Sequence, residues 1–574
     1  MSRFSSYQEL EAFLATEPSD YPYYYCDALG VYRGAEVKTT TASMGPSLVP
    51  GQSIDYLGTN NQVVGVDEAD IIKTDGEYIY YTVGTVVYIV KAYPAVGTEL
   101  VSEIELDGGV SQMYVNGDRL VLFEGGGCYG YWYYDCYSYA ADAGIKIYDI
   151  SNRANPVLIR DISTDGNYTS SRMIGDYVYV ITNDWIFDEE GQVELPEICI
   201  DGSVIEIDVQ DIYYSDVADS GYGFTTVMAL NVQYDLIEPS YATMLLGSAG
   251  NVYVSTDNIY ITLQQYTNDG EVTQIHRFSV DGPDVSYTAC GQVPGKLLNQ
   301  FSMDEHNGYF RVATTVGRVS KSSSDSMNNL YVLDMDLQVV GTLEDLAPGE
   351  SIYSTRFMGS RCYLVTFKKV DPFFVIDLSD PYNPEVLGEL KITGYSDYLH
   401  PYDENHVIGI GKETIAAEEG DFAWYQGVKI SLFDVTDVSD PVEIDKYEIG
   451  DRGTDTPVLH DHKAFLFDRE RNLLVMPVMI AEVEDGDNSP NAYGRPVWQG
   501  AYVFDISVDA GIDLKGGITH HDAGFEADDY WHRASVNDIR RSLYIEDVLY
   551  TVSDSAIKLN DIETLDYISQ VELS

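Results

Sequence analysis

Two acidic runs of the sequence carry side chains that could bind a hard metal ion. The run GVDEAD contains Asp67, Glu68 and Asp70, and the run AEVEDGDNSPNAYG contains Asp485, Asp487 and Asn488. Carboxylate and amide oxygens at such spacing suit Ca²⁺ better than a softer ion, although neither run has the twelve-residue EF-hand pattern. We therefore predict that either run could bind Ca²⁺. We expect that no cofactor is required. The alternative is an acidic turn without a metal.

Histidines and acidic residues gather near the C-terminus. The run GGITHHDAGFEADDYWHRAS contains His520, His521 and His532 beside four carboxylates. Imidazole nitrogens could bind a transition metal, but the spacing matches no HExxH-type site. An acidic, solvated insertion between strands is the alternative.

A Gly- and Tyr-rich segment combines two cysteines with closely spaced aromatic residues. Cys128 and Cys136 stand eight residues apart in GGGCYGYWYYDCYSY, and a disulfide between them would close this segment; the alternative is two free thiols. Exposed aromatic side chains offer rigid contact area for proteins or sugars, unless they only fill strand positions. We predict a binding role for five residues: Tyr129, Tyr131, Trp132, Tyr133 and Tyr134. The remaining cysteines allow no assignment of pairs: Cys26, Cys199, Cys290 and Cys362.

The overall charge excludes one class of partner. The 574 residues carry 33 Lys and Arg against 93 Asp and Glu, a formal charge of −60, with 45% hydrophobic residues. Such a chain can bury a large core, but it lacks the basic face that nucleic acid requires. The longest uncharged apolar stretch, Tyr78–Val90, is 13 residues. A membrane-spanning helix needs about 20, so we predict no transmembrane segment.

Short strands separated by Gly, Asp, Asn and Pro turns dominate the chain. Helical spacing is confined to the opening stretch from Ser6 to Thr16. A unit of four strands recurs, opening with a strand that ends in Asp-x-Ser/Thr or a close relative, as at Asp149, Asp377, Asp434 and Asp505. These aspartates are predicted to bond the amides of the following turn rather than to act as catalysts. Eight units are expected to start at Val86, Gly144, Thr225, Gln274, Asn329, Phe373, Val428 and Ala501.

This repetition predicts an all-β fold, a β-propeller of eight or nine four-stranded blades with a short N-terminal helix. The C-terminal AIKLNDIETLDYISQVEL reads as the first two strands of a blade, and ADIIKTDGEYIYYTVG near the N-terminus reads as the last two. Sharing one blade between N- and C-terminal strands would close the ring and remove two sheet edges. Residues 1–58 are assigned to the helix and a Tyr-rich lead-in, and residues 59–574 to the propeller.

Several long runs resemble a known family. TNNQVVGVDEADIIKTDGEYIYY (Thr59–Tyr81), the run Val370–Glu413, DHKAFLFDRERNLLVMPV (Asp461–Val478) and the run Arg540–Leu565 are similar to motifs of the archaeal and bacterial secreted β-propeller domain family, which is distantly related to WD-type propellers. The resemblance covers the chain from about Phe4 onward. It implies an exported protein, extracellular or at the cell surface, although no apolar leader precedes FSSYQELEAFL. It implies little about activity, because a fold does not determine function.

No motif of nucleophilic or phosphate chemistry stands out, so whether the chain is an enzyme stays open, with the balance against it. The first hypothesis is a non-catalytic binding or scaffold module for a protein or glycan partner at the cell surface. The alternative is an extracellular hydrolase or lyase with a site at the channel mouth, since ligands prefer concave pockets with convergent polar groups. That alternative requires several of five residues on one rim: Asp67, Asp70, Arg356, His400 and His532.

Overall fold

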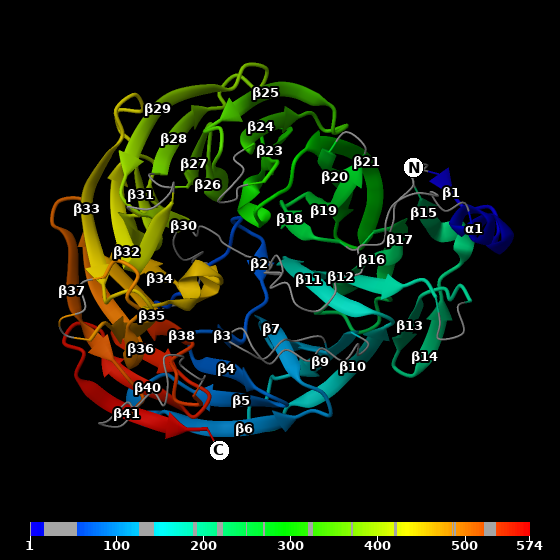
Figure 1. The fold of residues 1–574 in the computed structure, drawn as a ribbon. Helices are drawn as coiled ribbons and strands as arrows, with labels where there is room; N and C mark the ends of the chain where they lie inside the picture. Colours follow the sequence, from blue (N-terminus) through cyan, green and yellow to red (C-terminus); the bar gives the residue numbers. More distant parts are fainter. Residues whose placement is uncertain are drawn as a thin grey trace.

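The computed structural model describes residues 2–15, 54–125, 143–187, 192–214, 222–247, 249–267, 270–318, 325–368, 371–417, 422–484, 486, 489–521 and 535–573. In these ranges the strands form nine sheets arranged as a ring (Figure 1). Each sheet contains four neighbouring antiparallel strands, which together form one blade. The predicted β-propeller is confirmed.

The strands of blades 1 to 3 have the following bounds: β3 (Ile72–Thr74), β4 (Tyr78–Val83), β5 (Val86–Lys91) and β6 (Glu99–Glu105) in blade 1; β7 (Val110–Asn116), β8 (Arg119–Glu124), β9 (Ala143–Asp149) and β10 (Val157–Thr164) in blade 2; β11 (Asn167–Ile174), β12 (Tyr177–Trp185), β16 (Gly223–Asn231) and β17 (Ser240–Leu246) in blade 3.

Blades 4 to 6 contain β18 (Asn251–Val254), β19 (Asn258–Thr267), β20 (Gly270–Asp281) and β21 (Asp284–Pro294); β22 (Met303–His306), β23 (Tyr309–Val316), β24 (Met327–Leu333) and β25 (Val339–Leu346); β26 (Ser351–Met358), β27 (Arg361–Phe367), β28 (Asp371–Asp377) and β29 (Glu385–Ile392). Blades 7 to 9 contain β30 (Tyr395–Asp403), β31 (His406–Ala416), β32 (Ala423–Asp434) and β33 (Val442–Ile449); β34 (Leu466–Asp468), β35 (Leu473–Glu482), β36 (Arg495–Ser507) and β37 (Gly511–Ile518); β38 (Arg541–Ile545), β39 (Val548–Val552), β40 (Ala556–Asp561) and β41 (Tyr567–Glu572).

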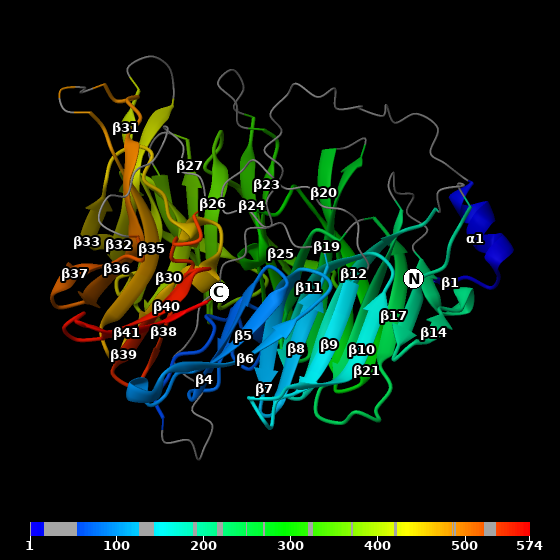
Figure 2. The ribbon, with the colours of Figure 1, turned by 90° about the horizontal axis from the view of Figure 1, so that it is seen from below.

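Shorter elements extend or connect these sheets. They are β1 (Ser2–Arg3), α1 (Tyr7–Leu14), β2 (Asp67–Glu68), β13 (Glu197–Ile200), β14 (Ser203–Glu206) and β15 (Ile212–Tyr214), with the 3₁₀ turns η1 (Ala95–Gly97), η2 (Val209–Asp211), η3 (Gln300–Ser302), η4 (Pro457–Leu459) and η5 (His462–Ala464). The predicted N-terminal helix is confirmed as α1, which Ser6 caps by accepting a hydrogen bond from the amide of Glu9. It lies at the outer side of the ring (Figure 2), where its Leu10 is buried in the same core cluster as Phe4 and Phe224 of blade 3.

The strand that ends in Asp-x-Ser/Thr is the third strand of each blade and not the first. The predicted unit starts fall in or at the beginning of β5, β9, β16, β20, β24, β28, β32 and β36, whereas the first strand of each blade lies nearest the axis (Figure 1). The aspartates do make turns: Asp149, Asp377 and Asp434 each accept a hydrogen bond from the amide two residues on. The repeat unit was therefore recognised correctly but read two strands out of phase.

Because the repeat begins at a different strand, the prediction that the two ends of the chain share one blade is wrong. β40 and β41 stay with β38 and β39, and β3 and β4 stay with β5 and β6, so both terminal blades are complete. The N- and C-terminal parts still close the ring. Tyr56 bridges Ile545 of β38, and a common core cluster joins side chains of blades 1 and 9, among them Ile79 and Tyr550.

No helix in the described residues is long and apolar enough to cross a membrane.

Candidate functional site

The centre of the ring is occupied by the chain itself. Residues 56–70, which we call the axial segment, run through the middle of the propeller, where β2 is seen in Figure 1. β2 pairs with the first strand of blade 3, Asp67 opposite Met173 and Glu68 opposite Arg172. Most of the axial segment belongs to the run Thr59–Tyr81 singled out in the sequence, so the first part of this run forms the hub of the ring, and its second part forms β3 and most of β4 in blade 1.

Hydrogen bonds tie the axial segment to several parts of the ring. The Asn60 amide donates to the Tyr398 hydroxyl of blade 7 at 3.3 Å and to the carbonyl of His462 at 3.1 Å. The Gln62 amide donates to the carbonyl of Gln300, beside blade 5, at 3.2 Å. The backbones of Asp70 and Met113 of blade 2 exchange two hydrogen bonds. Since rings of four to eight blades are usual, a ring of nine has a wider centre to fill, and this segment fills it.

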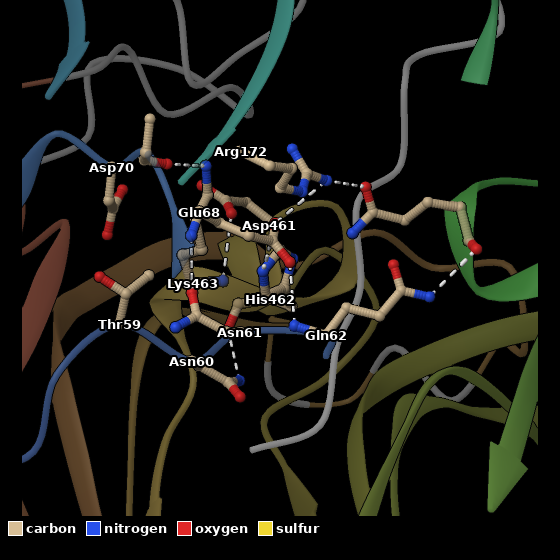
Figure 3. Close-up of polar contacts among 12 residues, drawn as sticks. Thr59, Asn60, Asn61, Gln62, Glu68, Asp70, Arg172, Asp461, His462 and Lys463 are labelled. Carbon is tan, nitrogen blue, oxygen red and sulfur yellow. Dashed lines mark hydrogen bonds and ion pairs between the residues drawn. The ribbon is translucent and has the colours of Figure 1, made fainter. Parts of the chain in front are cut away.

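Glu68 is a buried carboxylate of the hub (Figure 3). Its carboxylate lies 3.5 Å from Arg172 and 3.7 Å from His462, and accepts a hydrogen bond from the amide of Gln62 at 2.9 Å. Burial alone would raise the pKa of Glu68, but Arg172, His462 and Lys463 outweigh burial and hold this pKa below its ordinary value. Glu68 is therefore an ionised anchor.

The other two predicted calcium ligands face different cations. Lys73 binds Asp67 at 2.8 Å and the hydroxyl of Thr59 at 2.7 Å. Arg541 of blade 9 binds Asp70 at 2.9 Å and also pairs with Asp461. In the described ranges no three His, Cys, Asp or Glu side chains are grouped to hold a metal ion. Ca²⁺ at Asp67, Glu68 and Asp70 stays a prediction that this arrangement does not support, because each carboxylate already has a basic partner.

Equivalent positions of four first strands carry basic side chains toward this hub. Lys73 stands opposite Tyr80 in the hairpin of its blade, Arg172 opposite Tyr179, Arg356 opposite Tyr363, and His400 opposite Ile408. An alignment of the repeats on these hairpins would have shown that this position of the first strand is often basic. The acidic residues of the hub lie outside this repeated position and are distant in sequence from most of their basic partners, so no such alignment would have found them.

The residues of the hydrolase alternative do not form an exposed rim. Asp70, Arg356 and His400 are buried, and the Nδ1 of His400 lies 2.7 Å from the Tyr398 hydroxyl. Asp67 is partly exposed but bound to Lys73. Asp67 and Asp70 belong to the axial segment, Arg356 to β26 and His400 to β30, and His532 lies outside the described residues. The expectation of a set at the channel mouth is therefore wrong for the described members.

The neighbouring histidines 520 and 521 turn to different partners. The two ring nitrogens of His520 lie 2.7 Å from the Ser553 hydroxyl and 2.9 Å from the Thr551 hydroxyl, and burial lowers the pKa of His520 to about 3. His521 lies 2.9 Å from Asp538. His520 therefore acts as a neutral partner of two hydroxyls.

The other predicted site residues lie outside the described residues: Cys128, Tyr129, Tyr131, Trp132, Tyr133, Tyr134, Cys136, Asp485, Asp487 and Asn488. Cys26 does as well, whereas Cys199, Cys290 and Cys362 are free thiols.

Comparison with known proteins gives a family and two archaeal relatives. A family model described as a beta propeller domain matches residues 56–565. An uncharacterized protein of Archaeoglobus fulgidus is 27% identical over 672 aligned positions, covering 100% of this chain and 94% of the relative. An uncharacterized protein of Methanocaldococcus jannaschii is 30% identical over 591 positions, covering 90% of this chain and 83% of the relative.

Solved structures resemble the chain only distantly. A hypothetical selenium-binding protein of Sulfolobus tokodaii is 10% identical with a TM-score of 0.28, covering 65% of this chain and 75% of the other. Sqt1 of Chaetomium thermophilum is 11% identical with a TM-score of 0.34, covering 69% and 84%. Likenesses this distant carry no argument about function.

Proposed function

The chain belongs to the beta propeller domain family, and from this premise we propose that it is a non-catalytic binding or scaffold module for a protein or glycan partner, acting outside the cell or at its surface. The observation that carries the proposal is the filled hub. Glu68, Asp70 and Arg541 are buried and paired with one another or with neighbouring side chains. A catalytic group must reach its substrate, and these groups are already engaged.

The partner would then meet the loops and rims of the ring. The aromatic segment of residues 129–134 is the proposed contact, because rigid aromatic side chains give contact area at low entropic cost. Export and a disulfide between Cys128 and Cys136 are part of the proposal, and mass spectrometry of the native protein without reductant tests both. Two free thiols at these positions would count against an oxidising compartment.

The binding proposal is tested with isolated native cell envelopes and a cosedimentation assay. We expect a variant in which the five aromatic residues of the segment are replaced by Ser to bind at least tenfold more weakly. The matched control replaces three tyrosines that are 59% to 63% exposed elsewhere on the propeller, Tyr234, Tyr382 and Tyr567, and should bind within twofold of wild type. Equal losses in both variants would contradict a specific contact.

A further inference from the structure

Arg356 is a buried cation at the axis of the ring. It lies on β26, the first strand of blade 6, in the same register position as Arg172 on blade 3. It is 5% exposed, and its guanidinium carbon lies 5.2 Å from the ring centroid of Phe301.

Arg356 differs from every other buried Lys and Arg in the part of the chain that the structure describes. Eight Lys and Arg side chains are buried there, and seven have a carboxylate within 4.0 Å: Lys73, Arg160, Arg172, Arg311, Lys412, Lys429 and Arg541. Arg356 has no such carboxylate, and its Nε is buried without a hydrogen-bond partner. A buried charge is ordinarily paired, so this exception points to a missing anion.

Within the described residues, the axial segment makes no hydrogen bond or ion pair with the Arg356 side chain. Asn60 donates to Tyr398 of blade 7, and Gln62 donates to the carbonyl of Gln300 beside blade 5. Between them, Asn61 accepts a hydrogen bond from the amide of Glu68. The axial segment therefore gives Arg172 an ion pair with Glu68, whereas Glu68 acts on Arg356 only from beyond ion-pair distance.

Two buried polar atoms of η3, which packs against β26, also lack partners. They are the side-chain nitrogen of Gln300, whose side-chain oxygen accepts a hydrogen bond from Arg172 at 2.9 Å, and the hydroxyl of Ser302. Nearby carboxylates are already matched, Glu68 by Arg172 and Asp304 by Arg311. The unmatched charge is thus a single positive one. Burial lowers the pKa of Arg356 to about 10, as an unpaired guanidinium requires.

We propose that Arg356 binds one small monoanionic oxyanion of the carboxylate class beside η3, with the unpartnered side-chain nitrogen of Gln300 and hydroxyl of Ser302 as its neutral hydrogen-bonding groups. A guanidinium presents paired N–H groups that match a carboxylate. The carboxylate could be a free small acid or part of a larger ligand such as a uronic acid. The inference does not depend on the proposed surface partner.

The test titrates the full-length protein with sodium acetate, with sodium glucuronate in a parallel arm, at an ionic strength held constant with sodium chloride. We expect a saturable rise in melting temperature, about 2 °C at a hundredfold excess over Kd, together with a binding heat in calorimetry. Arg356→Gln should lose both, and Arg356→Lys should bind more weakly. The matched control Arg469→Gln, at a residue 58% exposed, should respond like wild type.

The two arms of the titration distinguish a free small acid from a carboxylate on a larger ligand, and they define the results that would contradict the proposal. A response to acetate indicates a free small acid, and a response to glucuronate alone indicates a ligand-borne carboxylate. Equal responses in wild type and Arg356→Gln, or no response to either acid, would overturn the proposal. So would a saturable response to sodium chloride alone that requires Arg356, because the site would then take a halide.

A second comparison remains informative if Arg356→Gln folds poorly. In anion-poor buffer Arg356→Met should melt at or above the wild-type temperature, because it removes a buried charge that has no partner, whereas Arg172→Met should melt lower. If Arg356→Met is destabilised as much as Arg172→Met, Arg356 is not an unpaired cation and the inference fails.

Discussion

The core clusters that join neighbouring blades are apolar, whereas ion pairs join the elements at the axis. Leu474 of blade 8 packs in one cluster with Ile408 and Ile430 of blade 7, but Arg541 reaches Asp70 across 471 residues of sequence. An apolar seam tolerates many combinations of similar volume, because burial is non-directional. An ion pair in the buried hub requires both partners, since either one alone is a buried charge. The seams therefore provide bulk stability, and the hub provides specific connections.

The largest expected effect comes from breaking an ion pair of the hub. Arg541→Met leaves Asp70 and Asp461 without their shared cation, and should lower the free energy of unfolding by about 3–5 kcal/mol. Denaturant titration measures this. The control Arg469→Met removes a pair with Asp403 at 3.3 Å at an exposed residue, where the cost should stay below about 1 kcal/mol. Equal losses would show that the hub is no more demanding than the surface.

A seam position should respond to volume and not to chemical identity. Leu474 is fully buried, so Leu474→Ala should cost about 3 kcal/mol through the cavity it leaves, and Leu474→Met less than about 1.5 kcal/mol. In the hub the similarly shaped change Glu68→Gln should cost about 2 kcal/mol, because Arg172 and His462 lose their carboxylate. Denaturant titration of the three variants measures these losses. If Leu474→Met lowered the free energy of unfolding as much as Glu68→Gln, the proposed difference between seam and hub would be wrong.

His520, a polar residue between two blades, should give the stability a pH dependence that differs from the one due to the hub. His520 lies between blades 8 and 9 with a pKa lowered from 6.5 to about 3. The unfolded chain binds this proton first, so the stability that depends on neutral His520 is full above pH 6.5 and is lost as pH falls toward 3, with a slope of up to about 1.4 kcal/mol per pH unit. His520→Gln should reduce this slope in melting curves between pH 6.5 and 4.5. Glu68→Gln should leave it unchanged, because Glu68 titrates below 4.5.

The smallest expected effects come from ions. A net charge of −60 opposes the compact state, so added salt should raise the melting temperature modestly by screening, with a Debye length of about 8 Å at physiological ionic strength. Calcium tests the Asp485 run separately. If this run binds Ca²⁺, millimolar calcium should raise the melting temperature more than sodium does at the same ionic strength, and the double variant Asp485→Asn with Asp487→Asn should remove this additional rise. Asp67→Asn should leave any calcium excess unchanged, because Asp67 is bound to Lys73. Identical shifts with calcium and sodium would reject a specific site.

Much of the propeller could be predicted from local pattern. The aspartate turns at 149, 377 and 434 and the helix of residues 7–14 depend on side chains a few residues apart. The phase of the repeat could not be predicted in this way, because a cyclic pattern of four strands has no marked beginning. Only packing shows that β3, and not β5, is nearest the axis.

The sequence by itself determined the class of fold and the four-strand unit, because strand alternation, turn chemistry and repetition are local properties; the run Thr59–Tyr81 was distinguished by its resemblance to a family motif. Tertiary structure alone decided that the first part of this run fills the ring and that Glu68 meets Arg172 and His462. It also decided that Arg356, in the position equivalent to Arg172, has no carboxylate. The physical reason is that each of these pairings joins residues from different blades, and their distance in space has no counterpart in their spacing along the chain.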